Sequence, residues 1–177
     1  MNKFSTKNIA LSGLFIALGI VLPFLTGQIP NIGRMLLPMH IPVLLCGFVC
    51  GWPFGLIVGF VTPLLRSVMF GMPPPFPTAV AMSFELAAYG LTAGLFYKYS
   101  KKNTLSTYIT LLLSMICGRI VWGIVSLVLY GLSGTAFTWQ MFAAGAFINA
   151  IPGIILQIVI IPPIIIALKR GNIIKDA

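Results

Sequence analysis

Charged residues are scarce in this sequence. Only 7% of its 177 residues are charged and only two are acidic, whereas 59% are hydrophobic. A soluble domain carries about 25% charged residues, so this chain could not cover a surface that faces water. We therefore expect an integral membrane protein of the cell membrane. We expect no nucleic-acid partner, because no basic face interleaved with polar residues accompanies the net charge of +9.

Long polar segments are also missing. The longest non-apolar segment, "YKYSKKNTLS" at 97–106, is too short for a soluble module, and no P-loop pattern appears. We therefore predict a single membrane-embedded domain over residues 1–177 that does not itself hydrolyse ATP. The three cysteines lie inside apolar runs without metal-ligand spacing, which favours packing. We expect no metal and no cofactor.

The apolar runs are long enough for helices that cross a bilayer, which needs about 20 residues per span. The predicted fold is all-α, with six transmembrane helices. Their expected ranges are 8–26, 37–51, 53–71, 79–97, 105–130 and 140–168. The first is interpreted as a retained helix, since no small-x-small cleavage site follows it. The second is short and almost touches the third, so a single re-entrant hairpin over 37–71 is the alternative.

Basic residues predict the orientation. Eight of the eleven fall on one side if six spans are correct, and cytoplasmic loops carry an excess of lysine and arginine. Both termini are therefore expected in the cytoplasm. The residues concerned are Lys3, Lys7, Lys98, Lys101, Lys102, Lys169, Arg170 and Lys175.

Polar residues inside a span mark candidate functional positions, because placing an ionisable side chain there costs about 3 kcal/mol or more. Five such residues fall in the outer half of the predicted topology, namely His40, Arg66, Glu85, Arg119 and Asn149, and Arg34 lies on the same side in the loop before the second span. Residues three or four apart share a helix face. That spacing adds Tyr89, Trp122 and Gln157 to the same faces. Together they could line a small-molecule cavity.

Structural roles remain open for several of these residues. Glu85 could simply neutralise Arg119 or Arg66 as an ion pair. His40 could be a satisfied histidine at the membrane interface, and Asn149 and Gln157 could join helices by hydrogen bonds. The charge balance nevertheless favours a ligand, since Arg66 and Arg119 face a single Glu85. A buried surplus cation needs an anionic partner, and arginine offers a forked donor set to carboxylate or phosphate. No catalytic residues are expected.

The first span carries a row of small residues. Ala10, Gly13 and Ala17 lie on or near one helical face. Small side chains let another helix approach closely in lipid, so this face is a candidate docking surface. Packing inside the same chain is the alternative.

These features together resemble the substrate-binding S components of energy-coupling factor (ECF) transporters. The resemblance covers nearly the whole chain and rests on its size, its six spans, "IALSGLFIAL" in the first span and "HIPVLLCGFVCGWPFGLIVGF" from His40. It implies a vitamin-binding subunit that works with a transmembrane coupling subunit and two cytoplasmic ATPases. It also implies that the small residues of the first span contact the coupling subunit. The family's motif commonly has two alanines, and Gly13 replaces the first here.

Within that resemblance, pantothenate is the favoured vitamin, because it has one carboxylate together with hydroxyl groups. A B6 vitamer, phosphorylated or not, is the next candidate. Two other functions compete. A self-sufficient small transporter would usually carry more intramembrane acids than Glu85. A membrane enzyme would need a Ser–His–Asp, HExxH or paired-acid pattern, and the sequence has none of these.

Overall fold

The structure is a computed structural model that describes residues 5–27, 35–101, 103–134 and 136–171. All the regular elements in these residues are helical, which confirms the all-α part of the predicted fold. The elements are α1 (Thr6–Gly27), α2 (His40–Cys50), α3 (Trp52–Phe70), the π-turn η1 (Pro75–Ala79), α4 (Val80–Tyr99), α5 (Thr104–Leu132), α6 (Trp139–Ala146), the 3₁₀ turn η2 (Ile148–Ala150) and α7 (Ile151–Arg170).

Within the described residues, five helical stretches are apolar and long enough to cross a membrane. They are Thr6–Gly27, Trp52–Phe70, Pro75–Tyr99, Thr104–Leu132 and Trp139–Arg170. The predicted second span is different, because α2 has only 11 residues. At 1.5 Å per residue it measures about 16 Å, roughly half of a bilayer core. Five predicted spans are thus confirmed as long apolar helices, and a sixth crossing stays a prediction.

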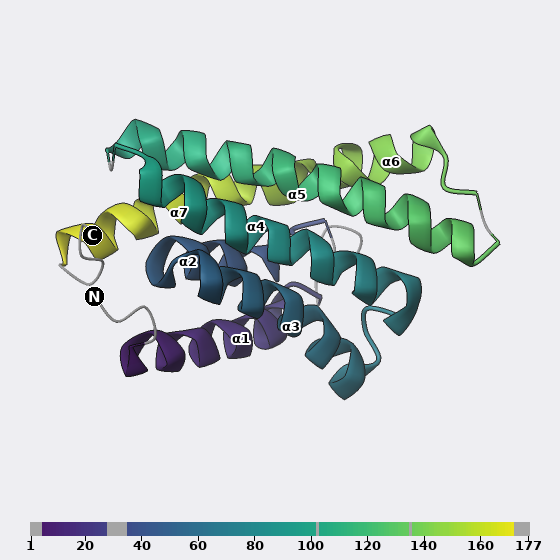
Figure 1. The fold of residues 1–177 in the computed structure, drawn as a ribbon, viewed down its shortest axis with the longest axis horizontal. Coiled ribbons are helices and arrows are strands. Elements are labelled where there is room, and N and C mark those ends of the chain that lie inside the picture. The colour runs from purple at the N-terminus through teal and green to yellow at the C-terminus, as the bar shows by residue number, and fades with distance from the viewer. Residues whose placement is uncertain (1–4, 28–34, 102, 135, 172–177) are drawn as a thin grey trace.

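The first turn of α1 and the last turn of α7 lie at the same end of the helix bundle (Figure 1). The α2–α3 turn and the α4–α5 connection lie at that end too. We call this the terminal end, and we call the end with the α3–α4 and α5–α6 connections the distal end. That the terminal end faces the cytoplasm remains a prediction from the lysine and arginine distribution.

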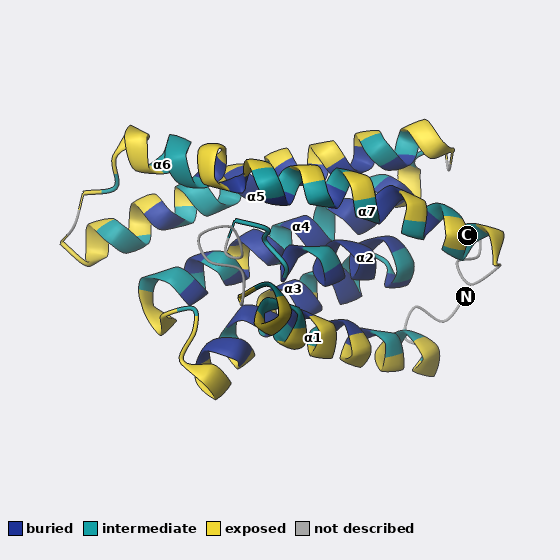
Figure 2. Cartoon of the chain, turned by 180° about the vertical axis from the view of Figure 1, so that it is seen from behind, coloured by how far each residue is buried: buried dark blue, intermediate teal, exposed yellow. Residues whose placement is uncertain are grey.

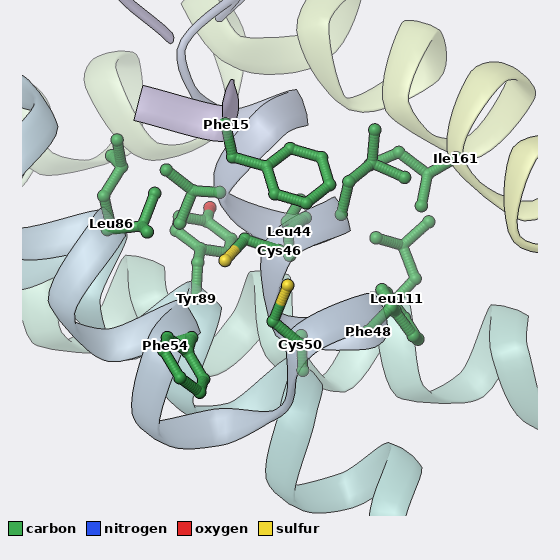
Figure 3. Close-up of a cluster of buried hydrophobic side chains, with 14 of the residues drawn as sticks. Phe15, Leu44, Cys46, Phe48, Cys50, Phe54, Leu86, Tyr89, Leu111 and Ile161 are labelled. Atoms are coloured by element: carbon green, nitrogen blue, oxygen red, sulfur yellow. The ribbon is translucent and has the colours of Figure 1, made fainter. Parts of the chain in front are cut away.

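Helix α2 occupies the centre of the bundle and is buried along almost its whole length (Figure 2). It packs against α1, α3, α4 and α7. Its apolar side chains meet those of the surrounding helices in one cluster, shown in Figure 3. The outward faces are also apolar, with Val68 85% and Leu25 67% exposed. Large apolar side chains directed outward on this scale are typical of helices that contact lipid.

Helices α3 and α4 touch backbone to backbone. A Cβ atom on Gly90 of α4 would overlap the backbone carbonyl of Gly55 on α3. Glycine at both positions allows this approach, and small residues serve the same purpose at helix interfaces in membranes. The contact fixes α4, and with it the polar residues that α4 carries.

The predicted last span is interrupted. Instead of one helix over 140–168, α6 ends at Ala146, and η2 precedes α7. The break lies just before Pro152, whose ring would clash with the carbonyl group of Ile148 in a continuous helix. This interruption changes where Asn149 lies, as described below.

Candidate functional site

Two buried polar side chains, those of Arg119 and His40, meet at the carboxylate of Glu85, which is itself buried. Arg119 donates a hydrogen bond from Nη1 to Glu85 Oε1 at 2.7 Å. The Nε2 atom of His40 lies 3.4 Å from the same oxygen. The exposed fractions of Arg119, Glu85 and His40 are 7%, 2% and 1%. The three residues come from α5, α4 and α2, so we call them the three-helix polar cluster.

Tyr89 packs beside this cluster. It lies one turn after Glu85 on α4, and its ring meets the ring of His40 edge-on with centroids 5.2 Å apart. The Tyr89 ring also packs onto Gly118 of α5, where an added Cβ would come within 2.7 Å of the ring. The residue before Arg119 thus has to be small for α4 and α5 to bring Glu85 and Arg119 together.

The cluster leaves several hydrogen-bonding atoms unused. Nε and Nη2 of Arg119 and Nδ1 of His40 are buried without a hydrogen-bond partner among the described residues. A buried donor without a partner costs about 1–3 kcal/mol, and more when the group is charged. Such atoms at a single site therefore indicate a place where a polar ligand would be stabilised.

The contacts of Arg66 lie outside the three-helix polar cluster. Its Nη1 donates to the carbonyl oxygen of Met72 at 2.7 Å, and its guanidinium lies 5.0 Å from the ring centroid of Phe24. The neighbouring Ser67 hydroxyl donates to the Pro73 carbonyl oxygen, also at 2.7 Å. Arg66 thus ties the segment after α3 to the end of α1, and of the two possible partners for Glu85 the structure selects Arg119.

Trp122 lies in an aromatic group at the distal end. Its ring stacks near Phe142 of α6, with centroids 6.1 Å apart, and meets Phe137 edge-on at 5.7 Å. An added Cβ on Gly145 would contact this indole ring. Trp122 therefore joins α5 to α6, one turn along α5 from Arg119.

The two amides predicted on the last span have different surroundings. Asn149 lies in η2 and is exposed, because the helix is interrupted before Pro152. Gln157 on α7 is buried, and its Nε2 has no hydrogen-bond partner among the described residues. The structure therefore directs only Gln157 into the bundle.

Ser126 is a further candidate that was not among the predicted site residues. It lies seven residues after Arg119 on α5 and is completely buried, and its hydroxyl has no partner in the described part of the chain. The seven-residue spacing from Arg119 was its signal in the sequence. Arg34, also predicted for the site, lies outside the described residues.

The small residues of α1 form an open surface. Ala10, Gly13 and Ala17 are all exposed, and no heavy atom would lie within 4 Å of a Cβ added to Gly13. The opposite face of α1 carries the buried residues, among them Ser12 and Phe15. Packing of the small-residue face against another described helix, the alternative considered for it, is therefore wrong. We call Ala10, Gly13 and Ala17 the α1 face.

The described ranges contain no group of three or more histidine, cysteine or acidic side chains that could hold a metal ion.

Among known proteins, the family described as ECF transporter, substrate-specific component, has a model that matches residues 7–165. The comparisons with curated proteins and with solved structures gave no match.

Proposed function

The chain belongs to the substrate-specific components of ECF transporters, and from this premise we propose that it captures a small anionic vitamin from the outer side of the membrane. Membership makes it a multi-pass protein of the cell membrane that binds a transported substrate and is not an enzyme. It also implies an ECF module as partner. The identity of the vitamin, the residues that bind it and the surface that meets the module are our proposals.

The observation that carries the proposal is the three-helix polar cluster. Arg119, whose side chain is only 8% exposed, has one carboxylate partner among the described residues and keeps two guanidinium nitrogens unpaired there. A buried arginine with free donors is suited to a carboxylate or phosphate. Tyr89 and the apolar residues around it supply the mostly apolar surroundings typical of small-molecule sites.

Pantothenate is the vitamin we favour. It has one carboxylate for Arg119, and its hydroxyl and amide groups suit the buried Gln157 and Ser126 as hydrogen-bond partners. A B6 vitamer is the next candidate, since its ring could stack on aromatic side chains and a phosphorylated form is anionic. His40, Arg66, Trp122, Asn149 and Arg34 stay in the proposed binding set as residues whose substitution should be compared with that of Arg119.

Delivery requires a partner surface. We propose that the α1 face contacts a transmembrane coupling subunit, which connects the chain to two cytoplasmic ATPases. Two facts support this surface: its residues are small, and no described helix of the chain covers it. Small residues let helix backbones approach closely in lipid, where packing contributes most of the association energy.

The experiment that tests the function starts with the purified chain. Mass spectrometry of the small molecules that co-purify with it should detect an anionic vitamin, and isothermal titration should then give saturable binding of that vitamin. Binding restricted to neutral compounds would contradict the proposed substrate class. ATP-independent uptake by the chain alone in liposomes would instead favour a self-sufficient transporter.

A further inference from the structure

The guanidinium group of Arg119 is held from one side only. Its Nη1 donates to Glu85, whereas Nε and Nη2 are buried and without a partner in the described ranges. Nε and Nη2 lie along the same edge of the planar guanidinium, and their two N–H bonds point outward in parallel. The unpaired atoms are therefore a matched pair of donors, already removed from water.

This edge has the geometry that a carboxylate recognises. Two parallel N–H groups can donate to the two oxygens of one carboxylate, and such bidentate pairs combine strength with orientation. A lysine at the same position would present a single charged point and could not form the pair. The requirement is thus for the fork, not only for the positive charge.

The net charge of the Glu85–Arg119 pair favours a ligand group with one negative charge. Glu85 and Arg119 are neutral as a pair, so a carboxylate adds one buried negative charge, whereas a phosphate monoester adds between one and two. His40 is the first residue of α2, and the partial positive charge of a helix N-terminus lies next to the cluster. That partial charge, about half an elementary charge, offsets a larger share of one added negative charge than of two.

The neighbours of Arg119 keep the fork in place. Glu85 fixes Nη1, and His40 contacts the same carboxylate oxygen, so Glu85 is constrained from two helices. Tyr89 fills the space between His40 and Gly118. A side chain that is orientated before the ligand arrives loses less entropy on binding.

We propose that the Nε/Nη2 edge of Arg119 binds the carboxylate of the substrate in a bidentate manner, and that Glu85 acts as the positioning residue for this edge. The proposal rests on the function proposed above, since it takes the chain to bind an anionic vitamin. It makes the substrate a monocarboxylate and excludes phosphorylated compounds as preferred ligands.

The test compares matched acids and neutral analogues on the unmodified chain. The probes are pantothenate with panthenol, in which an alcohol replaces the carboxylate, and pyridoxal phosphate with pyridoxal. Isothermal titration should give tighter binding of pantothenate than of panthenol by at least about 100-fold, as expected for two charge-assisted hydrogen bonds. Equal affinity for acid and alcohol would overturn the bidentate assignment and leave the proposed function intact.

The other outcomes separate the two proposals. Stronger binding of pyridoxal phosphate than of any carboxylate would overturn this inference while keeping an anionic substrate. Failure of all anionic probes, with binding of a neutral vitamin, would defeat the proposed substrate class and this inference together.

Variants then address the fork itself. Arg119→Lys should lower the affinity for pantothenate by about 10- to 100-fold, because the positive charge remains but the second hydrogen bond is lost. Glu85→Gln and Glu85→Ala both remove the negative charge, but only glutamine keeps an acceptor for Nη1, so the acid-to-alcohol ratio should be lower in Glu85→Ala than in Glu85→Gln. The matched control is Arg170→Lys at the exposed end of α7, which should bind like the unmodified chain. An Arg119→Lys protein that melts normally and binds pantothenate with unchanged affinity would refute the proposal.

Discussion

Arg119 on α5 donates a 2.7 Å hydrogen bond to Glu85 on α4, and both side chains are more than nine-tenths buried. Such a pair does not need to add stability, because burying two charges costs nearly as much as their attraction returns. Removing one partner is different, since the remaining charge is then buried alone. Replacing one member of the pair should therefore lower stability much more than replacing both members together.

Glu85→Ala should destabilise the protein by about 3–5 kcal/mol, the usual cost of breaking a buried ion pair from one side. Thermal unfolding in detergent, followed by circular dichroism, measures the effect. The double variant Glu85→Met with Arg119→Met should recover most of the stability while substrate binding is lost. If Glu85→Ala melts like the unmodified chain, Arg119 has another anionic partner and the cluster is described incorrectly.

Arg66 and Ser67 make a second prediction, because they hold consecutive carbonyl groups of the segment after α3. Arg66→Ala should lower stability by about 1–3 kcal/mol, since the partly buried hydrogen bond to Met72 and the contact with Phe24 are both lost. Ser67→Ala is the matched comparison and should cost about 1 kcal/mol.

The same variants test whether Arg66 contacts substrate. If Arg66 acts only by holding the segment after α3, Arg66→Ala should lose substrate binding and stability together. Ser67→Ala should then show a smaller loss of both. Complete loss of binding at an unchanged melting temperature would show direct contact with the ligand instead. Titration and melting curves on the same preparations distinguish these results.

The sequence predicted the parts of the site that depend on helix periodicity. Hydropathy located the long helices, and the spacing of Glu85 and Tyr89 placed them on one face of α4, where the structure has both of them near His40. Whether Glu85 would pair with Arg66 or Arg119 was open, because spans alone do not specify how far neighbouring helices are shifted along each other.

Two features depended on local backbone geometry and escaped the sequence analysis. The partner of Arg66 is the Met72 carbonyl oxygen, and every residue has a carbonyl group, so no side-chain pattern reveals that contact. Helical spacing predicts that Asn149 and Gln157 share a helix face. The interruption before Pro152 breaks that register, leaving Asn149 exposed and Gln157 buried. A proline near the start of an apolar run therefore predicts the helix boundary better than the periodicity of the whole run does.

The backbone contact between α3 and α4 gives a third prediction. Gly90→Ala should destabilise the protein by at least about 1–3 kcal/mol, because the added methyl group overlaps the Gly55 carbonyl and the two helices must separate. Gly131→Ala, in the last turn of α5, is the matched control, since a Cβ there would meet no atom within 4 Å. Unfolding midpoints in detergent measure both, and equal midpoints would contradict the close contact.

The α1 face gives the last prediction. Gly13→Ile should leave folding and substrate affinity unchanged, because the added side chain meets no described atom of the chain. In a complex, however, it would push the partner helix away, so co-purification with a tagged coupling subunit and vitamin uptake should both be lost. The matched control is Gly131→Ile, because Gly131 is also an exposed glycine but lies on α5, away from the α1 face. Normal uptake by Gly13→Ile would place the docking surface on a different helix, whereas lost substrate affinity would show that α1 shapes the binding site.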